Sequence, residues 1–234
     1  MKVKKLLLCL CMLFTFLCLS GCEEEYSLYS TNIVGPFDTV TTYMSYATSE
    51  EEFNKQKEYI NEKLEYYDSL FDRYNNYPDI NNIKTINDHA GKESIKVDPV
   101  LIDLLELSIE RYKTVSDKVN IAFGSVVDIW HDYREEAEFN GGIGKVPSLN
   151  TLKAASLHTD INNIVIDQEA STVYLKDELS LLDVGATAKG YAIELVKDEL
   201  IEMGVDIWKI SLILLFLTMK IYVWKLILIK NMIK

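Results

Sequence analysis

The chain has 234 residues, of which 48% are hydrophobic and 26% charged, and its formal net charge at pH 7 is −12. So acidic a surface repels nucleic acid and anionic lipid, which excludes nucleic acid as a partner. The length between two compositionally unusual ends is sufficient for one domain with its own hydrophobic core.

The N-terminus has the pattern of an export signal. A short lysine-rich start and an apolar run over residues 6–19 lead into Leu-Ser-Gly-Cys, which ends at Cys22. This order is typical of a secretory signal, and its last four residues resemble a bacterial lipobox. We therefore predict residues 1–22 as a lipoprotein signal, Cys22 as the lipidation site and residues 23–33 as a polar tether. The lipid would anchor the domain to the extracytoplasmic face of the cell membrane. The alternatives are a plain signal peptide and an uncleaved anchor.

Cysteine and histidine usage excludes several kinds of site. All four cysteines lie in or at the end of the signal, so the mature domain has no disulfide framework, thiolate nucleophile or cysteine-ligated zinc. The three histidines have no mutual spacing typical of a metal site or a catalytic triad. We expect each of them to be a surface or loop residue: His89, His131 and His158.

Periodicity and capping residues predict the elements of the first half. Apolar residues recur at helical spacing in two segments, with Ser49 or Thr48 able to cap the first and Pro99 opening the second. An Asn-rich, proline-interrupted segment lies between them and predicts loops. In chain order we expect a helix over 50–70, loops and short turns over 74–88, a strand over 95–97 and a helix over 99–115.

The second half alternates predicted strands with helices. Two β-rich runs flank a polar turn and predict a hairpin, and Gly204 is suited to end the last helix. In chain order we expect a strand over 118–123, a short helix over 148–156, a hairpin of 161–166 with 172–175, a strand over 179–183 and a helix over 189–203. This mixture indicates an α+β or α/β fold.

The C-terminal segment 207–234 differs sharply from the rest. It contains no Asp, Glu, Gly or Pro, although it carries five lysines. A transmembrane or interfacial helix is one interpretation, and an out-of-frame tail is the other. The longest lysine-free piece, 210–219, is shorter than the ~20 residues that span a bilayer, and lysine is costly in hydrocarbon. These facts favour the out-of-frame tail.

The most informative stretch is Asp-Val-Gly-Ala-Thr-Ala-Lys-Gly-Tyr-Ala over 183–192. An apolar strand-like run precedes it and a helix-like run follows, so backbone N–H groups and a helix dipole can meet an anionic ligand at the turn. Lys189 adds a positive charge there, and Asp183 adds a carboxylate. The alternative is an ordinary strand-to-helix connection with a surface lysine.

The pattern Asp-x-Gly-Ala-x-Ala-Lys-Gly-Tyr-Ala resembles the signature of the FAD:protein FMN transferases, the ApbE-like flavin transferases. Three further stretches agree in order: residues 37–41 look like the family's first strand, 70–87 like its aromatic, Asn-rich segment, and 120–130 like the strand and turn before its characteristic tryptophan. The resemblance covers residues 34–206. It favours an α+β fold with a sheet core flanked by helices, incomplete at the C-terminus.

The resemblance implies an enzyme that cleaves FAD and joins FMN to a Thr or Ser hydroxyl of an acceptor protein, releasing AMP, with Mg²⁺ on the pyrophosphate. Family acceptors include subunits of membrane redox pumps. The backbone carbonyl of Ala186 maps to one metal ligand, and no catalytic residue is assigned. Five residues map to positions that contact FAD: Asp183, Lys189, Tyr74, Asn120 and Phe37.

The family's remaining metal ligands, an Asp and a Thr, come from a segment beyond Asp206, as does a His-bearing flavin segment. The tail offers no counterpart to them. We therefore expect a flavin transferase whose chain, as printed, is inactive. Two alternatives stay open: a membrane-anchored flavin- or nucleotide-binding lipoprotein without transferase chemistry, and a structural or docking module.

Overall fold

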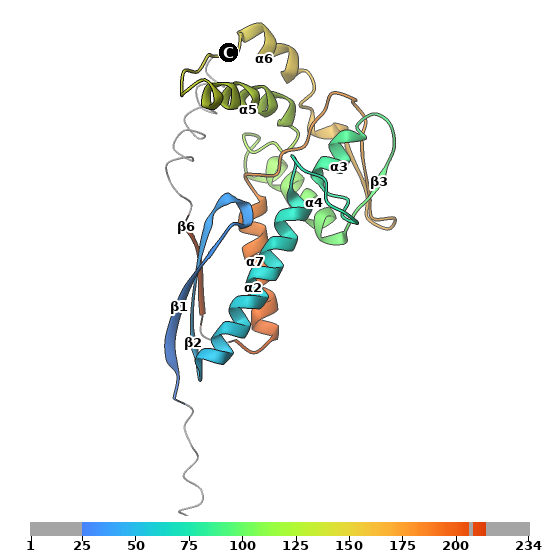
Figure 1. The fold of residues 1–234 in the computed structure, drawn as a ribbon. Helices are drawn as coiled ribbons and strands as arrows, with labels where there is room; N and C mark the ends of the chain where they lie inside the picture. The colour runs from blue at the N-terminus through green and yellow to red at the C-terminus, as the bar shows by residue number, and fades with distance from the viewer. Residues whose placement is uncertain (1–24, 206–207, 214–234) are drawn as a thin grey trace, which may run out of the picture.

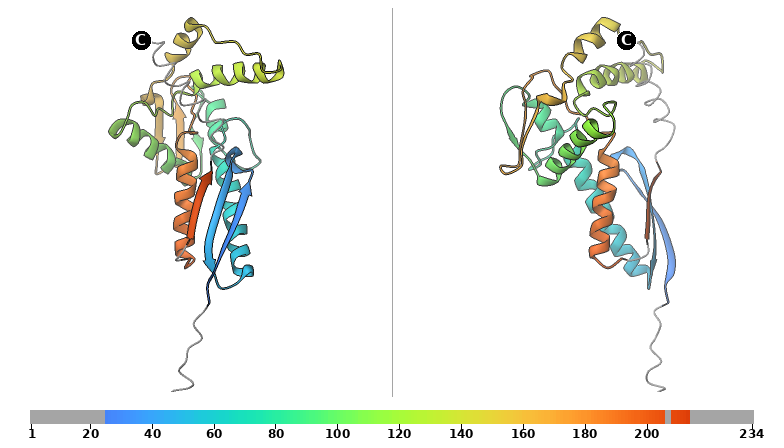
Figure 2. Two further views of the ribbon diagram at one scale, coloured as in Figure 1. Left: turned by 90° about the vertical axis from the view of Figure 1, so that its left-hand side faces the viewer. Right: turned by 180° about the vertical axis from the view of Figure 1, so that it is seen from behind.

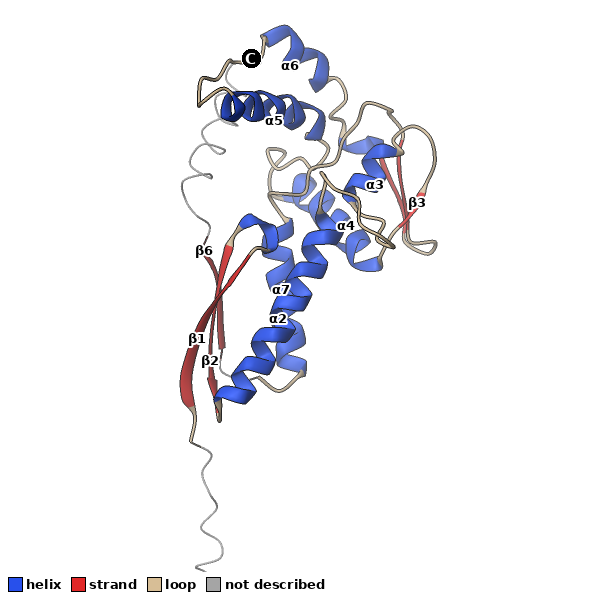
Figure 3. Cartoon of the chain, viewed as in Figure 1, coloured by secondary structure: helices blue, strands red, loops and turns tan. Residues whose placement is uncertain are grey.

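The structure, a computed structural model, describes residues 25–205 and 208–213. Helices dominate, and two small antiparallel sheets lie at different levels of an elongated molecule (Figures 1 and 3). The predicted α+β class is therefore confirmed. The predicted lipobox with Cys22 and most of the predicted tail lie outside the described residues.

The first sheet has the strand order β1-β2-β6, with β2 antiparallel to both neighbours. Helices α2 and α7 cover one face of it (Figures 1 and 2). Alternate residues of β2 are buried, as the period of a strand with one covered face requires. The elements are β1 (Ser27–Val34), β2 (Val40–Ala47), β6 (Trp208–Ile213), α2 (Glu50–Phe71) and α7 (Ala188–Glu202).

The N-terminal hairpin corrects two predictions. Residues 27–33 of the predicted tether belong to β1, in which Tyr29, Thr31 and Ile33 alternate inward with exposed neighbours. The predicted first strand at 37–41 is instead broken by a 3-10 turn, η1 (Pro36–Asp38), and strand geometry begins only at β2. Positive φ values at Phe37 and Asp38 exclude extended backbone there.

Helix α2 confirms the helix predicted over 50–70. The Ser49 side chain caps it by accepting a 3.2 Å hydrogen bond from the Glu52 N–H. Phe53 stacks on Tyr43 of β2 with ring centroids 5.4 Å apart, and Ile60 and Leu64 are fully buried. Burial of each such side chain contributes about 1.5–3 kcal/mol, so this face fixes the helix on the sheet.

The second sheet, β3-β5-β4, carries the predicted hairpin, although residues 161–163 of its first predicted strand form a 3-10 turn. The helices predicted over 99–115 and 148–156 are confirmed, while helix α3 forms inside a segment predicted as loop. Asn82 and Thr85 make a capping box for α3 that the sequence reading missed. The elements are α3 (Ile83–Asp88), β3 (Ile95–Lys96), α4 (Pro99–Thr114), α6 (Leu149–Ser156), η2 (Ile161–Asn163), β4 (Ile164–Asp167) and β5 (Thr172–Leu175).

Two predicted strands, 118–123 and 179–183, are not strands in the structure. The segments do lie against each other, but only two backbone hydrogen bonds join them, from Asp183 N to Ile121 O at 2.8 Å and from Gly124 N to Leu181 O at 3.0 Å. The chain then turns into α5 (Gly124–Phe139), a helix that was not predicted. Only two of its residues, Gly124 and Val126, are buried.

Residues 208–213 of the predicted tail form β6 along β2, with Val40 opposite Ile213. They are therefore not part of a helix. Within the described residues, none of the helices combines the length and the apolar character needed to cross a membrane.

Gly124 makes the closest approach to neighbouring backbone in the region that holds the predicted site. A Cβ at this position would lie 2.3 Å from the Leu181 carbonyl oxygen. We expect Gly124→Ala to lower the free energy of unfolding by about 1–3 kcal/mol, because backbone must shift to admit the methyl group. Urea denaturation measures this. Gly190→Ala is the matched control. It meets nothing within 4 Å and should raise stability by about 0.5–1 kcal/mol through helix propensity. Equal effects of the two variants would contradict the prediction.

Candidate functional site

The extended segment that enters the signature turn is fixed by one side chain. The Asn87 amide pairs with both backbone groups of Leu182: its Nδ2 donates to the carbonyl oxygen at 3.1 Å, and its Oδ1 accepts from the N–H at 2.7 Å. Asn87 thus replaces a neighbouring strand at this point. Because both backbone groups are satisfied away from water, the segment needs no sheet to stay extended.

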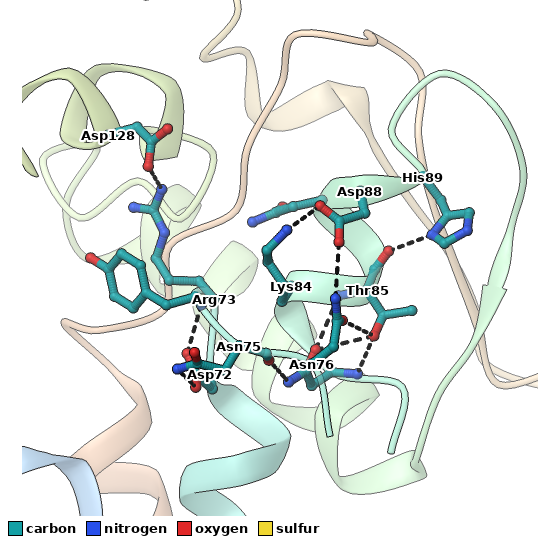
Figure 4. A network of polar contacts seen from close by, with 12 residues as sticks. Asp72, Arg73, Asn75, Asn76, Lys84, Thr85, Asp88, His89 and Asp128 are labelled. Atoms are coloured by element: carbon teal, nitrogen blue, oxygen red, sulfur yellow. Dashed lines mark hydrogen bonds and ion pairs between the residues drawn. The ribbon is translucent and has the colours of Figure 1, made fainter. Parts of the chain in front are cut away.

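Arg73 joins the signature turn to two other parts of the chain. Its side chain is only 7% exposed, and its two terminal nitrogens bond to Asp183 Oδ2 at 2.8 Å and to Asp128 Oδ1 at 2.7 Å (Figure 4 shows the second bond). Arg73 follows the end of α2, and Asp128 lies in the first turns of α5. The planar guanidinium suits such double contacts, and two carboxylates offset the cost of burying it.

The turn itself leaves the positive end of α7 open. The second oxygen of Asp183 accepts from the Gly185 N–H at 2.8 Å, which shapes the turn. The Thr187 hydroxyl bonds to the Val184 carbonyl and to Ser108, so it does not cap the helix, and the first turn contains no acidic residue. An uncapped helix start with backbone N–H groups favours an anion, which is what the sequence predicted here.

Lys189 belongs to this helix start, but its ammonium group is already engaged. Its Nζ donates to the Phe37 carbonyl and lies 5.5 Å from the Phe37 ring centroid. Burial lowers the pKa of Lys189, while the carboxylates of Asp38 and Asp68 act to raise it. The structure therefore brings Lys189 and Phe37, two predicted FAD contacts, directly together.

Phe37 has an uncommon backbone conformation for a bulky residue. Its φ is +58°, and that of the following Asp38 is +53°. The N–H of Phe37 hydrogen bonds to the Asp68 carboxyl, whose pKa burial raises against the effect of that bond. A turn held from both sides by Lys189 and Asp68 can keep this strain, and such residues concentrate at functional sites.

Tyr74 lies directly beside Arg73 at the edge of this site. The residue as a whole is 45% exposed, and the Arg73 guanidinium carbon lies 5.1 Å from the ring centroid. The loop that carries it is fixed by Asp72, whose carboxylate accepts from the Tyr74 N–H at 2.6 Å and from the Tyr77 hydroxyl at 2.9 Å. Figure 4 shows how this loop continues into polar contacts with α3.

Asn120 has a different role from these groups. Its Nδ2 donates to the Thr159 carbonyl at 2.8 Å, and its Oδ1 accepts from the Ala122 N–H at 2.9 Å. Both ends of the amide therefore support the chain around residues 120–122. The structure gives Asn120 a role in local architecture, and its contact with FAD stays a prediction.

Ala186 is exposed at the signature turn, and its carbonyl oxygen accepts no hydrogen bond from the residues the structure describes. Over the same residues, no group of three or more His, Cys, Asp or Glu side chains could hold a metal ion. Mg²⁺ requires a nearly octahedral set of oxygen ligands. One carbonyl does not supply such a set, so these residues alone do not form a magnesium cage.

Three contributors to the site were missed from the sequence as site residues: Arg73, Asn87 and His131. Arg73 is a lone cation inside a segment rich in Asp and Asn, and that isolation was the available signal for a paired, buried role. Asn87 carried no signal beyond its place at the end of a motif. His131 was expected on the surface or in a loop, yet it lies in α5 with a side chain only 16% exposed.

Comparison with known proteins gives consistent results. A model described as the ApbE family matches residues 37–212, most of the chain. A curated FAD:protein FMN transferase from Klebsiella pneumoniae (strain 342) is 26% identical over 141 residues, which cover 58% of this chain and 42% of that protein. The chain thus spans less than half the length of this relative.

Solved structures share the fold. The flavin transferase ApbE from Vibrio cholerae has a TM-score of 0.64 at 16% identity, over 79% of this chain and 57% of the other. The ApbE protein from Thermotoga maritima has a TM-score of 0.66 at 19% identity, over 80% and 57%. At such identities these structures establish the similarity of the fold.

Arg73→Met tests whether the double ion pair holds the site together. We expect the free energy of unfolding to fall by about 1–3 kcal/mol, because two carboxylates lose their shared cation while their partial exposure limits the penalty. Denaturant titration measures the change. Lys55→Met, which removes the exposed pair with Glu51, is the control and should change nothing measurable. An Arg73 variant as stable as the control would show that the bridge is dispensable.

Proposed function

The chain belongs to the ApbE family, and we propose that it is an FAD:protein FMN transferase. In this reaction the oxygen of a Thr or Ser hydroxyl on an acceptor protein bonds to the FMN phosphorus of FAD. The bond from that phosphorus to the AMP oxygen breaks, AMP leaves with that oxygen, and the hydroxyl proton is released to solvent. Because the chain covers 42% of its curated relative, both the activity and the acceptor, a membrane redox-pump subunit by family resemblance, are proposals.

The observation that best supports the proposal is the construction of the signature turn. Asp183 is held in place by Arg73 and Gly185, the start of α7 has no side-chain cap, and Lys189 is in its first turn. Phosphoryl transfer depends mainly on positioning and on neutralising charge, and this turn offers backbone N–H groups and one ammonium for a pyrophosphate.

Lys189 would serve the pyrophosphate by leaving or sharing its bond to the Phe37 carbonyl. A desolvated ammonium group interacts more strongly with an anion than a hydrated one does, because the local dielectric constant is lower. Tyr74, which is exposed, supplies a ring surface at this region for the flavin or adenine, whereas Phe37 is buried and would act through its bond to Lys189. We assign no general base among the described residues.

Mg²⁺ is the proposed metal cofactor of this reaction. When bound to the pyrophosphate it would balance the negative charge that develops on the leaving phosphate. Among the described residues, Ala186 offers a single carbonyl oxygen.

The function is tested with FAD, Mg²⁺ and the acceptor protein of a related transferase. Covalent flavin on the acceptor, seen as fluorescence in a denaturing gel and as an FMN mass increment, supports the proposal. The printed chain is assayed beside a frame-restored form. This comparison tests the expectation that the printed chain is inactive. FAD binding without transfer by either form would favour the flavin-binding lipoprotein. If neither form binds FAD or transfers FMN, the proposal is overturned and the docking module is the remaining alternative.

Lys189→Met should weaken FAD binding about ten- to a hundredfold, because a charge-assisted contact contributes roughly 1.5–3 kcal/mol. Methionine keeps most of the aliphatic stem and removes the charge. Titration of FAD fluorescence measures the dissociation constant. Lys153→Met in α6 removes an exposed lysine of the same kind and should leave binding unchanged. Equal affinities of the Lys189 variant and the wild type would show that Lys189 takes no part in binding.

Cys22 is the proposed lipidation site and sets the proposed localisation at the extracytoplasmic face of the cell membrane. Mass spectrometry of the mature protein should find a diacylglyceryl-modified Cys22 as the first residue. Cys22→Ala should release the protein from the membrane fraction or leave its signal uncleaved. An unmodified N-terminus at another position would refute the anchor.

A further inference from the structure

His131 lies in ring contact with Tyr74, although the two residues belong to separate elements. Their ring centroids are 4.6 Å apart with an interplanar angle of 28°, which is a stacked arrangement. Tyr74 follows the end of α2, whereas His131 lies in the middle of α5. The Arg73 guanidinium also lies over the Tyr74 ring, so three planar groups meet at one edge of the site.

The orientation of His131 is set by its own helix. Its Nδ1 lies 2.6 Å from an Arg134 nitrogen, which can only donate, and its Nε2 lies 2.9 Å from Glu135 Oε1. These partners assign the neutral tautomer with the proton on Nε2. One donor and one acceptor fix the plane of the ring, and the plane of the ring fixes the stack.

The stack matters to the site because Arg73 links it to the signature turn. The guanidinium over Tyr74 is the one that bonds to Asp183 and, through Asp128, to α5 itself. Helix α5 has few buried residues, so the ion pair with Asp128 and the stack of His131 are two of its attachments to the loop that carries Tyr74. Tyr74 nevertheless keeps 45% of its surface exposed.

We propose that His131 is a positioning residue for ring binding: it holds Tyr74 so that the exposed surface of the tyrosine receives a planar heteroaromatic ring of the dinucleotide. The inference rests on the proposed function, since it takes FAD as the ligand. Either the flavin or the adenine supplies the same flat, polarisable surface. A tyrosine already fixed by a neighbour loses less conformational freedom on binding, which increases affinity.

The test separates the ring of His131 from its hydrogen bonds. His131→Phe keeps a ring that can stack on Tyr74, and His131→Gln keeps a polar side chain without a ring. We expect His131→Gln to weaken FAD binding about two- to tenfold, the range of an aromatic pair, and His131→Phe to stay within about twofold of the wild type. His89→Gln, at a histidine of the α3 C-terminus, is the matched control and should bind FAD as the wild type does.

Ligand fragments identify which ring lies on Tyr74. A loss for FMN but not ADP assigns the flavin, and a loss for ADP but not FMN assigns the adenine; both outcomes support the proposal. Equal losses for both fragments, equal losses in the Phe and Gln variants, or no loss in the Gln variant would overturn it. A thermal scan without ligand shows that each variant is folded. If the wild type itself does not bind FAD, the proposed function fails before His131 is at issue.

Discussion

A buried guanidinium between two carboxylates is the constraint on which the site depends. Removing Arg73 from water is costly, and the bonds to Asp128 and Asp183 offset that cost only if α2, α5 and the signature turn keep their relative positions. The same bonds leave Asp183 with one oxygen for the Gly185 N–H, which closes the turn. The approach of backbone at Gly124 and the Asn87 amide then hold the segment that leads into it.

A second constraint ties the first sheet to the same turn. Phe37 and Asp38 hold left-handed backbone conformations, which cost about 1–3 kcal/mol each. Lys189 from α7 binds the carbonyl of Phe37, and Asp68 from α2 accepts from its N–H, so both backbone groups of this residue are held. The loop between β1 and β2 is therefore part of the site, and a ligand that draws Lys189 away would also act on this loop.

The sequence predicted best where local chemistry decides. Capping by Ser49 and Ser148, proline at the start of α4 and glycine after α7 set helix ends that the structure confirms. The predictions failed where distant partners decide: α5 has only two buried residues, and the segments at 118–123 and 179–183 bury Ile121 and Leu182 without forming a strand ladder. A short buried segment that forms no strand ladder has the same apolar pattern in the sequence as a strand.

The sequence by itself determined the family signature, the acidic charge, the absence of cysteine after Cys22 and the identity of Asp183, Lys189 and Ala186 as candidate ligands. Only the tertiary structure decided which groups meet them. Arg73 lies 55 residues from Asp128 and 110 from Asp183, and Lys189 lies 152 residues from Phe37. Local sequence patterns govern hydrogen bonds within one element, whereas the pairing of buried charges depends on how elements pack. The cost of desolvating a charge is offset only where packing places an opposite charge beside it.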